Sequence, residues 1–262
     1  MKPNPKSKSK IMEPKPYFYL YGITRVVAAS PGILAPGVDG TGVVEAIAVD
    51  DLMAWYSPVS SREFGSELPQ WMEDLEWLAE RGVRHQKVVA EIAARTAIVP
   101  ARFGTVFILR RNLTKHVAAH ASETGEALKR VQDAEEWGVK VLRRLSPKPP
   151  QAVAGPVTSG AAYLRKKSAL QSQRESERES KRESEISPEL VAFANELSKC
   201  AVAAAPVGKL SSAQRGLEWQ ATFLVKKDDK SKWESVLRNY AARWADAREI
   251  ECTGPWPPYS FV

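Results

Sequence analysis

The stretch Tyr17-Phe18-Tyr19-Leu20-Tyr21-Gly22-Ile23 sets the expected fold class of this chain. Aromatic and β-branched residues favour strands, so a run this rich in them predicts a central strand of a sheet. Val43–Val49 alternates in the manner of a second strand, and Leu52–Ser57 follows directly after Asp50-Asp51. The two alternating segments and the tight turn between them predict a hairpin.

A long helix is expected to begin at Pro69 and to end near Thr96. Its apolar residues recur three and four positions apart and form one stripe: Trp71, Leu75, Leu78, Gly82, His85, Val89 and Ile92. The next segment, Ile98–Ile108, contains Pro100 and Gly104 and therefore predicts a strand, a bend and a second strand.

A second helix and a closing strand complete this region. Asn112 is expected to cap the helix, with Leu113, Val117, Leu128 and Val131 facing inward. Glu135–Leu142 is expected to close the same domain as a strand. The order of strands, helix, strand, helix and strand predicts an α+β domain, in which helices cover one face of an antiparallel sheet.

Proline-rich residues 146–158 predict a linker, which divides the chain into two domains. Residues 17–145 would form the first domain, and residues 159–254 a smaller α+β domain with a long polar helix. The second domain contains a well-alternating strand at Leu217–Val225, and then an amphipathic helix with Trp233, Val236, Leu237, Tyr240, Ala241 and Trp244 on one stripe. Residues 1–16 are expected to be a disordered basic leader, and residues 255–262 an aromatic tail.

The positive charge of the chain is concentrated at its start. The formal net charge of the 262 residues is +7, and the five lysines and one glutamate of residues 1–16 contribute +4 of it. A nucleic-acid-binding protein would carry its basic residues on the folded body, so this distribution removes most of the support for that class.

No apolar run is long enough to span a bilayer, so we expect no membrane association. The two cysteines, Cys200 and Cys252, lie on apolar stretches. We expect both thiols to be small core residues in a reducing, cytoplasmic setting, without a disulfide between them.

The histidines are weak candidates for chemistry. His116 and His120 stand four apart on a predicted helix, which is the spacing of a metal-binding pair, but no third ligand accompanies them. His85 lies on the apolar stripe of the long helix, which favours a hydrogen-bonded core histidine over a general base. We therefore expect no metal, no cofactor and no catalytic residue.

Arg102 is the best candidate for contacting an anion. It lies between Pro100 and Gly104, but no glycine-rich anion loop surrounds it. Support of the bend, or pairing with an interdomain carboxylate, is the preferred interpretation over an enzyme that uses this arginine. Gly37–Gly42 is likewise better explained as turn chemistry than as a phosphate loop, because no helix follows it.

The chain ends in Gly254-Pro255-Trp256-Pro257-Pro258-Tyr259-Ser260-Phe261-Val262. Prolines exclude a helix or an inner strand here, and three aromatic rings need a surface to cover. We expect the tail to pack internally across the interdomain seam, with presentation to a partner as the alternative. The expected structural or interdomain residues are Arg102, Phe103, Gly104, Trp137, Tyr163, Trp256, Pro257, Pro258, Tyr259 and Phe261.

Taken together, these segments resemble the gas vesicle protein GvpL/GvpF family from about Tyr17 to Val262. The resemblance rests on seven segments in order: 19–23, 37–40, His85, 100–105, 136–140, 159–164 and 254–261. The lysine-rich leader and the repetitive Arg/Glu/Ser segment depart from the family's pattern.

The resemblance implies two α+β domains, the first ferredoxin-like, and no catalytic residue. It also implies a cytoplasmic accessory or minor structural protein of gas vesicle assembly. Such a protein binds the small hydrophobic shell subunit and other vesicle accessory proteins. The alternative is a nucleic-acid-binding module that stacks bases on a ferredoxin-like sheet.

Overall fold

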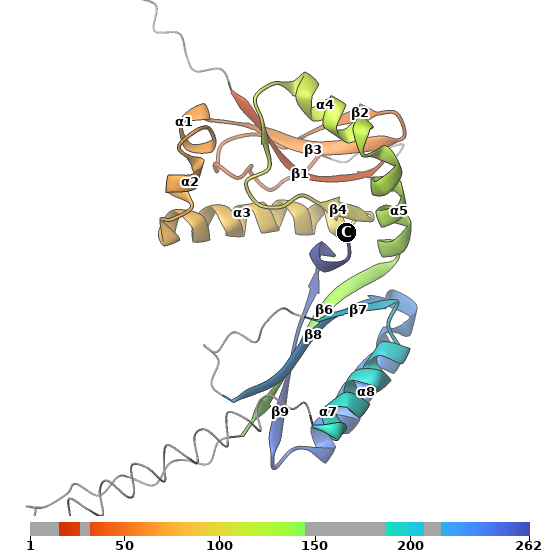
Figure 1. Cartoon of the computed structure of the whole chain (residues 1–262). Helices are drawn as coiled ribbons and strands as arrows, with labels where there is room; N and C mark the ends of the chain where they lie inside the picture. Colours follow the sequence, from red (N-terminus) through yellow and green to blue (C-terminus); the bar gives the residue numbers. More distant parts are fainter. Residues whose placement is uncertain (1–15, 27–31, 145–186, 207–215) are drawn as a thin grey trace, which may run out of the picture. The chain divides into compact units, whose positions relative to one another are not determined.

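The computed structural model describes residues 16–26, 32–144, 187–206 and 216–262 (Figure 1). The chain forms two compact units, one made of the residues up to Asp133 together with Trp256–Val262, and the other of Ala134–Pro255. Both units combine antiparallel strand pairs with helices, so the predicted α+β class is confirmed. The expected linker at 146–158 and the long polar helix lie outside the described residues.

The first unit is built on β1 (Tyr17–Arg25), which lies between β3 (Leu52–Val59) and β4 (Ile98–Pro100). β2 (Glu45–Val49) pairs with β3 through the turn Asp50-Asp51, as predicted, and β5 (Val106–Phe107) also pairs with β1. The aromatic run is thus the central strand, and the bend between β4 and β5 lies beside it.

Helices cover both faces of this first sheet, which corrects the prediction of helices on one face. Tyr19, Tyr21 and Trp55 pack on one side with Val88 and Ile92 of α3 (Leu75–Ala93). On the other side, Leu20, Ala54 and Tyr56 pack with Leu113 and Val117 of α4 (Arg110–Ala119) and Leu128 of α5 (Ala121–Val131). β1 and β3 are buried along nearly their whole length because both faces are covered.

The helix boundaries differ from the predicted ones. A short α1 (Ser61–Phe64) and α2 (Leu68–Trp71) precede α3, whose first turn is capped by the Asp74 carboxylate accepting from the backbone N–H groups of Glu76 and Trp77. α4 begins at Arg110, after Leu109, so Asn112 is not its cap. The predicted second helix is interrupted at His120, which separates α4 from α5.

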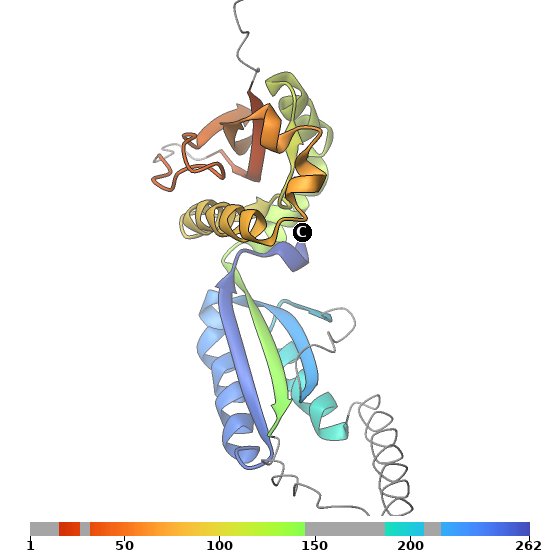
Figure 2. The same cartoon turned by 90° about the vertical axis from the view of Figure 1, so that its left-hand side faces the viewer.

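The second unit is a four-stranded sheet in the order β7 (Ala203–Pro206), β8 (Leu217–Lys226), β6 (Ala134–Arg143) and β9 (Arg248–Trp256). In this unit α7 (Pro188–Lys199) and α8 (Lys230–Arg243) lie together on one face (Figure 2). The predicted stripe of α8 is confirmed by the buried side chains of Trp233, Leu237, Tyr240 and Trp244.

The strand predicted at Glu135–Leu142 exists as β6, but it pairs with β8 in the second sheet and not with the first. This corrects the prediction that it closes the first domain. Period-2 alternation identifies a strand but carries no information about which sheet the strand joins.

Candidate functional site

The candidate site is the place in the first unit where the C-terminal tail, α3 and the β4–β5 bend meet. Its central group is His85, whose side chain is buried between the three elements. The tail is short and mostly apolar: Pro257, Pro258 and Phe261 are buried, and residues Tyr259–Phe261 form a single 3-10 turn. The tail is therefore a structural part of the first unit.

A chain of hydrogen bonds passes through His85. The Tyr19 hydroxyl lies 2.9 Å from His85 Nδ1, and the Tyr259 hydroxyl lies 2.8 Å from His85 Nε2. The Gly104 backbone N–H donates to the Tyr19 hydroxyl at 3.2 Å. A neutral imidazole has one donor and one acceptor nitrogen, so the two hydroxyls take opposite roles toward it. The network joins β1, α3, the β4–β5 bend and the tail.

Burial controls the charge of these groups. Desolvation lowers the pKa of His85 to about 4, against a smaller opposite effect of a hydrogen bond to the backbone of Ala101. Burial also raises the pKa of Tyr19 above its usual value and that of Tyr21 to about 12. The network is therefore neutral at neutral pH, which suits an anchor for the tail.

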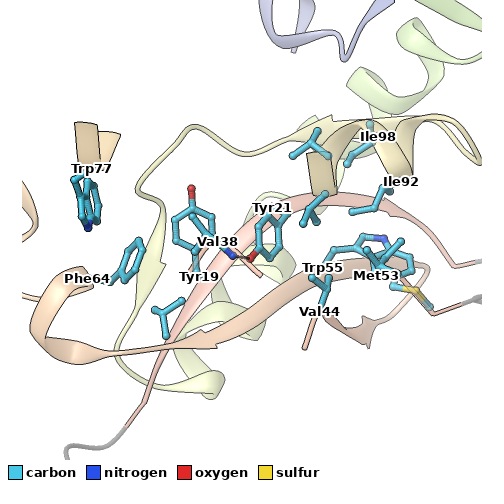
Figure 3. Close-up of a cluster of buried hydrophobic side chains, with 14 residues drawn as sticks. Tyr19, Tyr21, Val38, Val44, Met53, Trp55, Phe64, Trp77, Ile92 and Ile98 are labelled. Atoms are coloured by element: carbon cyan, nitrogen blue, oxygen red, sulfur yellow. Dashed lines mark hydrogen bonds between the residues drawn. The ribbon is translucent and has the colours of Figure 1, made fainter. Parts of the chain in front are cut away.

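Aromatic rings surround the network. The His85 ring stacks on Tyr21 and meets Tyr19 and Phe103 edge to face. Figure 3 shows Tyr19 and Tyr21 within the buried cluster on this side of the sheet, with Phe64 and Trp77 nearby. The Tyr21 hydroxyl accepts from the Val38 backbone N–H at 2.7 Å and bonds with Ser57 Oγ at 2.8 Å, so it too is paired.

The β4–β5 bend brings the predicted residues Phe103 and Gly104 to this site. Gly104 has a φ of +83°, a left-handed conformation that favours glycine. Arg102 stands next to them, but its side chain is exposed and has no ion pair among the described residues. The bend itself is held by the Thr105 backbone N–H and hydroxyl, which both donate to the Arg102 carbonyl.

The other predicted site residues are not part of this cluster. Trp137 belongs to the second unit, where Lys230 lies over its ring and Gly254 packs directly against it. Trp256 is exposed. Tyr163 lies outside the described residues.

The predicted metal pair does not form a binding cluster. His120 Nδ1 lies 2.8 Å from the His116 carbonyl oxygen, and the centroids of the two rings are 4.4 Å apart. In the described part of the chain, no group of three or more His, Cys, Asp or Glu side chains is placed to hold a metal ion. Cys200 is half-buried and Cys252 exposed, both as free thiols, so the expectation that both are core residues is wrong for Cys252.

Comparison with known proteins matches these features to one family. The family described as "Gas vesicle synthesis protein GvpL/GvpF" matches residues 17–262. The chain belongs to this family. Gas vesicle protein L from Streptomyces sp. (strain CB03234) is 28% identical over 255 residues, which are 93% of this chain and 92% of that protein.

Two solved structures of family members share the fold. GvpF from Anabaena sp. PCC7120 has a TM-score of 0.62 at 16% identity, covering 94% of this chain and 95% of its own. GvpF from Microcystis aeruginosa has a TM-score of 0.63 at 16% identity, covering 94% and 98%. This GvpL/GvpF chain thus has a role connected with gas vesicles. Among the helices that the structure describes, none combines the length and hydropathy that a membrane span requires.

Two features of the site are not predictable from the sequence patterns above. The tyrosines of β1 read only as strand formers, although their spacing of two residues places Tyr19 and Tyr21 on one face. The tail is expected to pack internally, but the sequence patterns do not identify His85 as the residue that it contacts. A buried histidine on a helix and a tyrosine near the C-terminus are potential hydrogen-bond partners. The 174-residue separation of His85 and Tyr259 hides this pairing from any local sequence pattern.

Proposed function

We propose that the protein is a non-enzymatic accessory or minor structural protein of gas vesicle assembly, which binds the small hydrophobic shell subunit and other vesicle proteins. The observation that carries the proposal is the family match, which extends over residues 17–262 and therefore includes both units and the tail. Nearly complete mutual coverage with Gas vesicle protein L supports it, because no large catalytic insertion distinguishes the two chains.

Physical reasons favour such a role. A shell subunit with a large apolar face aggregates unless a partner covers that face before polymerisation. This chain offers two kinds of surface for that purpose. The sheet edges β2 and β9 can accept an added strand, and exposed apolar side chains such as Leu75 can contact an apolar helix.

The arrangement at His85 also favours a binding protein over an enzyme. Both ring nitrogens are occupied by tyrosine hydroxyls, and the network ends on a backbone amide and on the tail. A general base works best with a pKa near the operating pH, whereas burial lowers the pKa of this imidazole to about 4. We infer that the protein acts in the cytoplasm, at growing vesicles.

Co-purification tests the proposal. The tagged full-length chain is expressed with the shell subunit in a vesicle-forming host whose own copy of the gene is deleted, and the tag alone serves as the control. We expect the shell subunit to be retained with the chain and vesicle formation to depend on it. Normal vesicles in the deletion strain, together with no retained shell subunit, would contradict the proposal.

A further inference from the structure

The first unit contains an apolar cleft of about 400 Å³ beside the His85 site. It is lined by residues of α3, the end of α2, the β4–β5 bend and the tail: Met72, Leu78, Gly82, His85, Gln86, Phe103 and Tyr259. The tail thus forms one wall of the cleft, here called the α3 cleft, and leaves the rest of it open.

Gly82 is the residue that keeps the α3 cleft open. It lies in the interior of α3, where glycine is less favourable than alanine by about 1 kcal/mol. A Cβ built at this position meets no atom within 4 Å, and its φ is not in the left-handed range. Neither close packing nor backbone conformation requires glycine at this position. The consequence of the missing side chain is space at the surface of the helix.

An exposed apolar rim borders the same space. Leu75, Leu78 and Gly82 follow one another at spacings of three and four along one face of α3. The Leu75 side chain is 79% exposed, and Met72 at the end of α2 is also exposed. A continuous apolar strip with an indentation at its end is a surface suited to an inserted apolar side chain.

The surroundings of the strip are acidic. Residues 63–80 contain Glu63, Glu67, Glu73, Asp74, Glu76 and Glu80 and no lysine or arginine. The two arginines that follow this segment on α3 are already paired: Arg81 contacts Glu63 and Glu80, and Arg84 contacts Glu80. Within the described residues, the carboxylates of Glu67, Glu73 and Glu76 form no ion pair or hydrogen bond.

We propose that the α3 cleft binds a basic amphipathic helix of a partner protein, with an apolar side chain inserted above Gly82 and lysine or arginine side chains beside Glu67, Glu73 and Glu76. Helix-in-groove binding uses apolar anchors at this spacing, and opposite charge fixes the register of the helix. The inference deepens the proposed function, on which it rests, by naming the chemistry of one partner.

A synthetic peptide of this chemistry tests the site directly. The probe is a fluorescent helical peptide of about 18 residues, with leucines at i, i+3, i+4 and i+7 and lysines on its other positions. Its binding to the full chain is measured by fluorescence anisotropy. We expect saturable binding that weakens with salt, and at least tenfold weaker binding of the same peptide with glutamate in place of lysine. Equal binding of the two peptides would overturn the proposal.

Gly82→Leu separates binding from folding. The new side chain fills the cleft while improving helix propensity, so we expect at least tenfold weaker probe binding with an unchanged or raised Tm. Ala90→Leu is the matched control, because Ala90 is an exposed α3 residue that does not line the cleft, and its binding should stay within twofold of wild type. Unchanged probe binding by Gly82→Leu would overturn the proposal.

Two further sets of variants test the acidic side chains beside the cleft and whether the chain's own leader occupies the cleft. Glu73→Gln with Glu76→Gln should weaken binding severalfold and flatten its salt dependence. If replacing Lys6, Lys8 and Lys10 by Gln instead raises probe affinity tenfold, the chain's own leader occupies the cleft and the assignment to a partner is overturned. The result is separable from the proposed function, because retention of the shell subunit by the tagged chain is measured independently of probe binding.

Discussion

In the first unit helices pack on both faces of the sheet, whereas in the second unit both helices that the structure describes pack on one face. The difference extends to buried polar groups. In the first unit the indole N–H of Trp55 donates to Thr24 Oγ1, and that of Trp77 donates to Glu63. In the second unit the indole N–H groups of Trp137, Trp233 and Trp244 are buried without a partner among the described residues.

The comparison indicates where each unit gains its specificity. A hydrogen-bonded buried group selects one packing, because breaking its bond leaves a desolvated donor or acceptor. The first unit uses such groups to position the β4–β5 bend and the tail. In the second unit the aromatic core centres on Phe193, which contacts the rings of Trp219, Tyr240 and Trp244. We therefore expect the two units to respond differently to matched substitutions.

The largest effect is expected from Phe193→Ala in the second unit. Phe193 is fully buried, so its truncation should lower the free energy of unfolding by about 3–5 kcal/mol. Val191→Ala on the same helix is the control, since Val191 is 46% exposed and should change that energy by less than ~0.5 kcal/mol. Urea unfolding followed by tryptophan fluorescence measures both. Similar losses for the two variants would show that α7 does not pack as described.

The next effect is a pH dependence that comes from His85. Its pKa is about 4 in the folded chain against 6.5 when unfolded, so the unfolded state binds the proton first as the pH falls. Stability is complete above pH 6.5 and declines toward pH 4, by roughly 3 kcal/mol in total at ~1.4 kcal/mol per pKa unit.

The free energy of unfolding in urea is measured between pH 7 and pH 5. Most carboxylates titrate below this range, so the measured change comes mainly from histidine. His85→Gln should lower stability at pH 7 and flatten the slope in this range. His116→Gln is the matched control, because the pKa of His116 is also lowered but its side chain is exposed. A slope that disappears in His116→Gln and persists in His85→Gln would refute the assignment.

A smaller effect should distinguish paired from unpaired indoles. Trp55→Phe removes a bonded N–H and Trp233→Phe an unbonded one, while the loss of volume is the same. We expect the first substitution to be more destabilising by about 1 kcal/mol. Thermal unfolding of the two variants measures the difference, and a larger loss for Trp233→Phe would remove the proposed contrast between the units.

The smallest effect is expected from Arg102→Ala. The Arg102 guanidinium is exposed and unpaired among the described residues, so stability should change by less than ~0.5 kcal/mol. Vesicle formation should also continue in a strain that carries the variant. Loss of vesicles with a stable, folded variant would revive the anion-contact hypothesis for this residue.

Patterns within single elements are predictable from the sequence. The aromatic strand, the hairpin at Asp50-Asp51, the buried position of His85 and the apolar stripe of α8 all follow from local periodicity and turn chemistry. Which strands pair with one another, and which sheet a strand joins, is not predictable in this way. β6 alternates equally well whichever sheet it joins, and its pairing with β8 depends on residues far away in sequence.

The site is predictable only in part for the same reason. The sequence identifies Phe103, Gly104 and Tyr259 as structural residues, but the atoms that join them are the Tyr19 hydroxyl and the His85 ring. Those two residues carry ordinary core patterns, and only the folded chain brings them to the tail. The α3 cleft escapes prediction because Gly82 falls on the apolar stripe, where it contributes no side chain.

The central claim is that the tail is a structural part of the first unit, and truncation before Pro255 tests it most directly. The shortened chain loses the Tyr259–His85 hydrogen bond and the buried Phe261 ring. We predict that the shortened chain is still folded at about 25 °C and that its Tm is lower than that of the full chain by on the order of 5 °C. An unchanged Tm would contradict the claim and leave the tail as an exposed ligand for a partner.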